Sequence, residues 1–410
     1  MSPATTDLIH QSKAQKALLE RGITELTTEE LDELVQANAH VFDDDFDRPY
    51  AASLHRNIFS LLNRYYFRSQ FIGFEEFPER NNPAHPLIFI SNHSGMAFPW
   101  DGMVLGAEIL KMKGYDFRDA ARPLVAPMLT QTRLMNPFLI PNFWKKGSGV
   151  NATALNFETL MRLNCSNALI YPEGVPGIGK GFNNKYQLQQ FSSSFVHMSL
   201  KYRTDIVPIL CVNAEYINPW SYKAAWVDKL VRRIGIPFLP LSPILIGLIF
   251  QPWLFYFAFP ARLTYVIGRR IKAYDITDKP YEEMTPAEIK TARDFVRASM
   301  QTNLDEAVKA YGDQPYRWRE YFANLFQRVA HLPFLFSPGW VLLFSEHERQ
   351  YQLSKDKENV VVKLNHLSLL RVLWHNPFSV FFFIPVLGWL PILLKGYKGA
   401  TFKATVSEPK

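Results

Sequence analysis

A histidine and a following aspartate have the residue types of a general base and its carboxylate partner. His93 follows a short apolar run and stands in the sequence Phe89-Ile90-Ser91-Asn92-His93-Ser94-Gly95. Asp101 comes at the predicted start of the next helix. A carboxylate on one ring nitrogen of a histidine fixes the tautomer and leaves the other nitrogen free to accept a proton. We therefore expect His93 to be a catalytic base; the alternative is a hydrogen-bonded structural histidine beside a helix-capping Asp101.

A carboxylate, several glycines and a lysine follow a second apolar run, about eighty residues later. The segment reads Ala168-Leu169-Ile170-Tyr171-Pro172-Glu173-Gly174-Val175-Pro176-Gly177-Ile178-Gly179-Lys180. Its glycines allow close approach of the backbone to a ligand, and consecutive amides together with Lys180 could hold a phosphate. Gly174, Gly179 and Lys180 have the spacing of a Walker A loop, but Gly181 replaces the Ser or Thr that holds magnesium. We therefore expect no nucleotide hydrolysis.

The two segments together resemble the motifs of the glycerolipid (lysophospholipid) acyltransferase superfamily. Members of that family carry an Asn-His block followed by an aspartate, then a Pro-Glu-Gly block and then a Val-Pro-Ile block. Here the same order is given by Asn92-His93, by Pro172-Glu173-Gly174 and, after Phe191 and Phe195, by Val207-Pro208-Ile209. The resemblance covers roughly residues 50–310.

The resemblance implies a fold, a reaction and a set of site residues. The fold is an α/β domain with an apolar tunnel for the acyl chain, and the donor is acyl-CoA or acyl carrier protein, so no cofactor is expected. His93 matches the catalytic base and Asp101 its partner, while Glu173 with Gly174 matches the block that binds the acceptor's polar head. The predicted substrate-binding residues are Asn92, Ser94, Gly95, Tyr171, Pro172, Glu173, Gly174, Lys180 and Lys146.

The sequence departs from the family pattern in two places. Phe98 stands where the family has its aspartate, and Asp101 comes later, at the end of a longer loop. Between the two segments, Lys145 and Lys146 occupy the region in which the family has an arginine. This second difference favours a neutral acceptor such as mono- or diacylglycerol, or a different lysolipid, over lysophosphatidate.

The expected reaction is acyl transfer to a hydroxyl of a glycerolipid or lysophospholipid, a step of phospholipid biosynthesis. His93 takes the proton of the hydroxyl as its oxygen attacks the thioester carbonyl. The sequence has no Gly-x-Ser-x-Gly nucleophile elbow and no Cys beside a His, so no acyl-enzyme is expected. Two alternatives remain open: an esterase or thioesterase in which the same base activates water, and a catalytically silent lipid-binding protein.

The elements that position these residues alternate between short apolar runs and helical stretches. This alternation predicts an α/β domain with a central mixed sheet flanked by helices. Predicted strands are Leu87–Ser91, Arg122–Ala126, Phe138–Pro141, Ala168–Tyr171, Ile206–Val212 and Leu263–Ile267. Predicted helices are Asp101–Lys113, Asn151–Leu163 with Asn151 as its cap, Gln190–Tyr202, and a helix from Thr285 to about Lys309. The chain then divides into an N-terminal helical segment (residues 1–50), an acyltransferase domain (51–310) and an apolar, membrane-associating C-terminal extension (311–410).

Composition and charge fit this class of function and exclude others. Of 410 residues, 48% are hydrophobic and 20% are charged, which excludes wholesale disorder and a protein of many membrane spans. The net charge of +7 fits an anionic membrane surface or a phosphorylated substrate, but not a nucleic-acid partner. Cys165 and Cys211 are too few for a disulfide scaffold, and the histidines lack metal-binding spacing. We therefore expect a reducing compartment and no metal site.

Two long uncharged segments indicate where the protein could meet a membrane. Residues 234–261 and 376–394 carry no charge, but prolines interrupt both, so we expect neither to span a bilayer. The predicted membrane contacts are Trp253, Phe255, Tyr256, Phe257, Phe381, Phe382, Phe383 and Trp389, with Arg232, Arg233, Lys395 and Lys398 at the head groups. The alternative is that these aromatic residues pack inside. Since the chain starts without an apolar leader, we expect it at the cytoplasmic face of a membrane, in an oligomeric state that the sequence leaves open.

Overall fold

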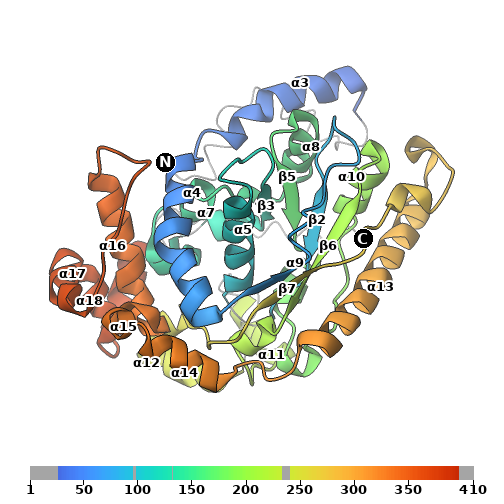
Figure 1. Cartoon of the computed structure of the whole chain (residues 1–410). Coiled ribbons are helices and arrows are strands. Elements are labelled where there is room, and N and C mark those ends of the chain that lie inside the picture. Colours follow the sequence, from blue (N-terminus) through green and yellow to red (C-terminus); the bar gives the residue numbers. More distant parts are fainter. Residues whose placement is uncertain (1–25, 96–97, 132, 233–240, 397–410) are drawn as a thin grey trace.

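The computed structural model describes residues 26–95, 98–131, 133–232 and 241–396. In these ranges the chain forms a seven-stranded sheet with the strand order β1-β7-β6-β2-β5-β3-β4 (Figure 1). The strands are β1 (Gln70–Ile72), β2 (Ile88–Ser91), β3 (Ala121–Val125), β4 (Val150–Asn151), β5 (Asn167–Ile170), β6 (Ile206–Val212) and β7 (Thr264–Ile267). Neighbouring strands pair in parallel except β6 and β7, which are antiparallel. The predicted α/β class with a central mixed sheet is confirmed.

Side chains alternate between the two faces of the sheet and build two cores. In β2, Phe89 points into one core, while Ile88 and Ile90 point into the other. Helices α4, α5 and α16 cover the first face, and α8, α10 and α13 cover the second. The helices are α3 (Thr28–Asn38), α4 (Arg48–Leu54), α5 (Trp100–Met112), α6 (Pro127–Gln131), α7 (Phe143–Lys146), α8 (Ala154–Leu163), α9 (Gly174–Ile178), α10 (Ser194–Tyr202), α11 (Ala225–Arg232), α12 (Pro243–Phe250), α13 (Pro286–Tyr311), α14 (Trp318–Phe326), α15 (Leu332–Leu335), α16 (Trp340–Leu353), α17 (Leu369–His375), α18 (Pro377–Val380) and α19 (Trp389–Pro391).

The long helix α13 starts where its capping sequence predicts. The Thr285 side chain accepts a hydrogen bond from the backbone N–H of Glu288 at 3.3 Å, and the Glu288 carboxylate accepts one from the backbone N–H of Thr285 at 2.7 Å. Pro286 takes the first helical position, where its missing N–H removes no hydrogen bond. The helix runs slightly beyond the predicted end at Lys309, to Tyr311.

Two local predictions are wrong. Residues Pro137–Leu139 form a short 3-10 helix in place of the predicted strand Phe138–Pro141, and Phe138 has a left-handed φ of 51°. A short apolar run fits a buried helical turn as well as it fits a buried strand. Asn151 ends the edge strand β4 and does not cap α8. The cap is Thr153, whose side chain accepts a hydrogen bond from the backbone N–H of Asn156 at 3.1 Å.

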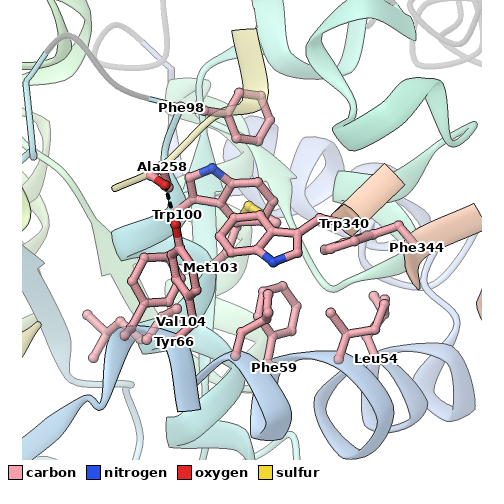
Figure 2. Packing of buried hydrophobic residues seen from close by; sticks show 14 of the residues in the cluster. Leu54, Phe59, Tyr66, Phe98, Trp100, Met103, Val104, Ala258, Trp340 and Phe344 are labelled. Atoms are coloured by element: carbon pink, nitrogen blue, oxygen red, sulfur yellow. Dashed lines mark hydrogen bonds between the residues drawn. The ribbon is translucent and has the colours of Figure 1, made fainter. Parts of the chain in front are cut away.

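The chain after α13 returns to the core on the α5 face of the sheet. Figure 2 shows Trp100, the first residue of α5, packed against Trp340, the first residue of α16, with ring centroids 4.7 Å apart. Phe344, one turn further along α16, contacts the same Trp100 ring at 5.9 Å. The boundary predicted at residue 310 falls at the end of α13, yet α16 belongs to the same packed core as α4 and α5.

Polar contacts also tie α16 to the start of α4 and to the end of α7. Glu348 pairs with Lys146 at 2.8 Å, and the Lys146 ammonium lies 4.2 Å from the ring centroid of Tyr50. The hydroxyl of Tyr351 donates a hydrogen bond to Oδ1 of Asp47 at 2.6 Å, and the same carboxylate caps α4. These contacts fix α16 against two helices that are far from it in the sequence.

The aromatic residues predicted to contact a membrane differ in their exposure. Tyr256 and Phe382 are buried, so inward packing, the alternative, is correct for these two. The other six are half-buried or exposed: Trp253, Phe255, Phe257, Phe381, Phe383 and Trp389. Arg233 and Lys398 lie outside the described residues. Within the described ranges, no helix is both long and apolar enough to cross a membrane.

Candidate active site

Three neighbouring strands deliver polar residues to one edge of the sheet. β6, β2 and β5 are adjacent and parallel, so their carboxyl ends meet at the same edge. β2 leads into His93, β5 leads into Glu173 and β6 leads into Glu215. All three side chains are buried. The two predicted motifs therefore meet, and β6 adds a carboxylate that the sequence reasoning missed.

Asn92 anchors the point at which the chain leaves β2. Its side-chain amide donates a hydrogen bond to the backbone oxygen of Cys211 at 2.9 Å and accepts one from the backbone N–H of Cys211 at 2.8 Å. The side chain thus continues the pairing between β2 and β6 beyond the last strand residue. Asn92 was predicted to bind substrate, and the structure places its whole amide in this contact between strands.

The main chain and the ring of His93 are held by the second motif. The backbone N–H of His93 donates to Oε1 of Glu173 at 2.9 Å, and Oε2 of Glu173 accepts from the backbone N–H of Gln189 at 2.8 Å. The His93 ring stacks on the Tyr171 ring with centroids 4.5 Å apart and planes inclined by 25°. A Cβ atom at Gly177 would overlap Cβ of Glu173 and lie 3.1 Å from Cδ2 of His93, so glycine is required between the two side chains.

His93 is electrically neutral in this environment. Burial lowers its pKa to about 3, and the positive charge of Lys180 lowers it further. At neutral pH the ring therefore keeps a lone pair that can accept a proton. Nδ1 of His93 is buried and has no hydrogen-bond partner. A neutral ring with an unused nitrogen has the first requirement of a general base.

Asp101 lies close to His93 in the structure, but not in the predicted contact. Its Oδ2 accepts a hydrogen bond from the backbone N–H of Ser94 at 3.2 Å, while its Oδ1 is buried without a partner. Among the described residues, no hydrogen bond joins the Asp101 carboxylate to the His93 ring. Burial raises the pKa of Asp101 to about 7. The carboxylate is therefore attached to the main chain next to His93, and its charge changes near neutral pH.

Lys180 is a buried member of an ion cluster. Its Nζ lies 3.2 Å from Oε1 of Glu215 and 3.9 Å from Oε2 of Glu173. Burial alone lowers the pKa of Lys180, but the two carboxylates raise it by more, so the lysine stays charged. The lysine was predicted to bind substrate phosphate, and the structure pairs it with protein carboxylates instead. Glu215 could have been found from the sequence, since it follows the third strand of the same edge.

Glycines allow two loops of the site to approach each other. Gly95 has a left-handed φ of 71°, and a Cβ atom there would lie 2.9 Å from Cγ of Lys180. Gly174 has a left-handed φ of 56° at the start of α9. Both positions belong to the predicted substrate-binding set, and both require glycine for reasons of backbone geometry.

Lys146 lies outside the site. Its ion pair with Glu348 and its position over the Tyr50 ring occupy the ammonium group. It is not among the described residues that line the cavity next to His93. The position of Lys146 in the structure therefore does not support its predicted role in substrate binding. In the described part of the chain, no three His, Cys, Asp or Glu side chains come together in a way that could hold a metal ion.

A cavity of about 1370 Å³ opens from His93. His93, Asp101, Tyr171, Pro172, Glu173 and Gly174 are among the residues that line it. An apolar wall follows along α5 and β3, with Gly106, Leu110 and Leu124 among its residues. A Cβ atom added at Gly106 would meet nothing within 4 Å, so the glycine leaves open space along α5. The volume suits a long aliphatic chain with its reactive end at His93.

Comparisons with known proteins are distant. No known family profile matches the chain. Uncharacterized proteins of Mycobacterium tuberculosis and Mycobacterium bovis are 27% identical to it over 200 residues, 48% of this chain and 51% of theirs. The chain thus spans about half the length of the curated relatives it matches. The 1-acyl-sn-glycerophosphate acyltransferase PlsC of Thermotoga maritima aligns with 63% of this chain and 82% of its own, at 11% identity and a TM-score of 0.32. A correspondence this loose carries no argument about function.

Proposed function

We propose that the protein is an acyltransferase that moves a fatty acyl group from acyl-CoA or acyl carrier protein to a hydroxyl of a glycerolipid or lysophospholipid. One observation carries the proposal. A neutral, buried histidine stands at the carboxyl edge of the sheet and lines a large cavity that is also lined by many apolar residues. A base, space for an alcohol and space for a fatty chain are what this reaction needs.

In the proposed reaction, His93 accepts the proton of the acceptor hydroxyl while the oxygen attacks the thioester carbonyl. The tetrahedral intermediate then expels the thiolate of the donor, which takes the proton from the imidazolium. One carbon–oxygen bond forms, one carbon–sulfur bond breaks, and the histidine returns to its neutral state. A positioned base contributes about 10²–10⁴ in rate.

The imidazolium that forms needs a negative charge nearby, because burial disfavours it. We assign this role to ionised Asp101. The carboxylate is fixed by the amide of Ser94, the residue that follows His93, and its Oδ1 has no other hydrogen bond. His93 Nδ1 is equally without a partner. Asp101 acts through its charge on the ring, and the hydrogen bond predicted from the sequence is not required.

The charges around the cavity favour a neutral acceptor. Lys180 and Lys146, the two lysines predicted to bind substrate, are both paired with carboxylates. Other cations on the cavity wall are paired as well: Lys201 and Arg162 with Glu158, and Arg293 with Asp294. A phosphate head would have to break one of these pairs. Mono- or diacylglycerol needs only hydrogen bonds to its hydroxyl and esters.

The test is a survey of products by mass spectrometry. Purified full-length protein receives palmitoyl-CoA with a mixture of monoacylglycerol, diacylglycerol, lysophosphatidate and lysophosphatidylcholine. We expect one or more acylated neutral glycerides, and none with His93→Ala. Free palmitate formed at the same rate with and without acceptors would establish a thioesterase. Binding of palmitoyl-CoA without turnover on any acceptor would support the other alternative, a catalytically silent lipid-binding protein.

A further inference from the structure

Large apolar side chains stand in solvent along helix α17 and the 3-10 turn His366–Ser368 that leads into it. Leu367, Leu370 and Trp374 are 79%, 80% and 84% exposed. Their spacing places them on one face of the helix, while Val372 on the opposite face is fully buried in the core. A helix that turns its apolar stripe away from the protein needs a partner for that stripe. Single exposed apolar residues are common, but an ordered stripe marks an interaction site.

A second group of exposed apolar residues lies at the end of α12. Phe250, at that end, is exposed, and its backbone oxygen accepts a hydrogen bond from the N–H of Val386 at 2.7 Å. On α18, the exposed Phe378 lies beside a cation, since Nζ of Lys395 is 3.8 Å from its ring centroid. Helices α12, α17 and α18 lie on the same side of the molecule in Figure 1. We call the exposed residues Phe250, Leu367, Leu370, Trp374, Phe378 and Val386 the apolar surface.

The two chain segments that carry the apolar surface contain cations and no acidic residue, and the neighbouring Glu346 of α16 is buried. From Asn359 to Gly396 the sequence contains Lys363, Arg371 and Lys395, and neither Asp nor Glu. From Lys229 to Tyr274, a range that includes α12, it again contains neither Asp nor Glu. Lys363 and Arg371 are exposed. Exposed apolar residues in segments whose charges are all positive fit a lipid surface, in which the apolar layer lies beneath anionic head groups.

We propose that the apolar surface docks on a lipid bilayer that carries anionic head groups. Its leucines, phenylalanines and Trp374 enter the boundary of the acyl chains, and Lys363, Arg371 and Lys395 meet the head groups. A second copy of the chain fits less well, because a twofold contact would bring the same cations of both copies together. The bilayer supplies both the apolar layer and the opposite charge.

The chain segment after α19 contacts a segment next to the cavity. The turn at residues 392–396 packs on Arg133–Met135, where a Cβ atom at Gly396 would lie 3.6 Å from Cβ of Leu134. Helix α6, directly before that segment, lines the cavity with Pro127 and Leu129. If the proposed acyl transfer holds, docking brings the protein to the bilayer in which its lipid acceptor resides. Docking itself does not depend on that reaction.

The test is sedimentation of the full-length protein with vesicles, in the absence of any acyl donor. One set of vesicles is phosphatidylcholine mixed with phosphatidylglycerol, and the other is phosphatidylcholine alone. We expect binding to the anionic vesicles that weakens at high salt, and weaker binding to the neutral ones. Trp374→Asp and Leu370→Asp should each weaken binding roughly tenfold or more, because each places a charge in the apolar layer. Arg371→Gln should weaken only the binding to anionic vesicles, by about fivefold.

The matched control is Phe295→Asp. Phe295 is 53% exposed on α13, which lies on the opposite side of Figure 1 from α17. This variant should bind vesicles like the wild type, and all variants should keep the wild-type melting temperature. Wild-type protein that binds neither kind of vesicle would overturn the proposal. The proposal would also be overturned if the wild type were a dimer that bound no vesicles and Trp374→Asp made it monomeric. The apolar surface would then be a contact between two copies of the chain. Vesicle binding by a protein that forms no acylated product in the mass-spectrometric survey would overturn the proposed function and leave the docking surface in place.

Discussion

The backbone N–H of His93 donates a hydrogen bond to Oε1 of Glu173, at a distance of 2.9 Å. The other oxygen of Glu173 accepts the N–H of Gln189. Both oxygens are therefore used by the main chain, and the carboxylate fixes the residue that leaves β2. The family resemblance gives Glu173 a role in binding the acceptor, whereas its contacts make it a positioning residue for His93.

Glu173→Gln should lower kcat about a hundredfold with little change in KM for the donor. An amide offers an N–H₂ group to one of the two backbone N–H groups, so one hydrogen bond is lost and about 1–3 kcal/mol of stability with it. Steady-state kinetics and urea unfolding measure the two effects. Glu306→Gln, which removes an exposed ion pair with Arg269, is the control and should change neither. A large rise in KM with an unchanged kcat would show instead that Glu173 binds substrate, as the family resemblance implies.

His93→Ala should reduce transfer by about 10²–10⁴ while the protein remains folded. The ring has no side-chain hydrogen bond from Nδ1 to lose, and its main-chain bond to Glu173 survives the substitution. Circular dichroism and the melting temperature check the fold, and release of CoA in the presence of acceptor checks the rate. Turnover at the wild-type level in a folded variant would remove His93 from the mechanism.

The rate should increase with pH through about 7, where Asp101 ionises. Below this pH the protonated Asp101 offers no charge to the imidazolium, and above it the carboxylate does. His93 stays neutral throughout, because its pKa is about 3. Asp101→Asn should be slow at all pH values and should lack the step in a plot of log kcat/KM against pH. The same step in that variant would show that another group titrates.

The same ionisation should reduce stability as the pH rises. The folded state holds the Asp101 proton up to a pKa of about 7, whereas the ordinary value is 3.8. The contribution of Asp101 to the free energy of unfolding is therefore fully present below pH 4. It decreases as the pH rises towards 7, by up to about 4 kcal/mol. Asp101→Asn should have the smaller pH dependence and a higher melting temperature above pH 8. Calorimetry from pH 4 to pH 9 measures both. If the melting temperatures of the wild type and of Asp101→Asn changed in parallel with pH, the Asp101 carboxylate would not be buried as described.

Lys180→Met should lower stability by about 3–5 kcal/mol, because it leaves the carboxylates Glu215 and Glu173 buried without their cation. Lys180→Met combined with Glu215→Gln should recover part of this loss. Removing the cation should also raise the pKa of His93, which nuclear magnetic resonance of the ring can follow. An unchanged His93 pKa in a folded variant would contradict the electrostatic contact between the two residues.

The buried strands and the meeting of the two motifs follow from features that a sequence displays, whereas the strand order and the edge strands β1 and β4 were not predicted. Buried strands such as β2 and β6 read as short apolar runs, and parallel neighbours place their ends at one edge. The site details depend on contacts that no local pattern reports. The Trp100 indole donates to the backbone oxygen of Tyr256 at 2.9 Å and so sets the start of α5, which directs Asp101 to the amide of Ser94. The pairing of Lys180 with Glu215 likewise depends on three strand ends meeting in space.

The packing of Trp100 against Trp340 also bears on how the protein can be handled in the laboratory. A chain shortened after Tyr311 would uncover the indole of Trp100 and the rings around it, since the helix that covers them would be gone. Such fragments would aggregate before any assay could be run. Loss of activity in them would then reflect insolubility and would say nothing about which groups take part in catalysis, so substitutions within the intact polypeptide are the safer route.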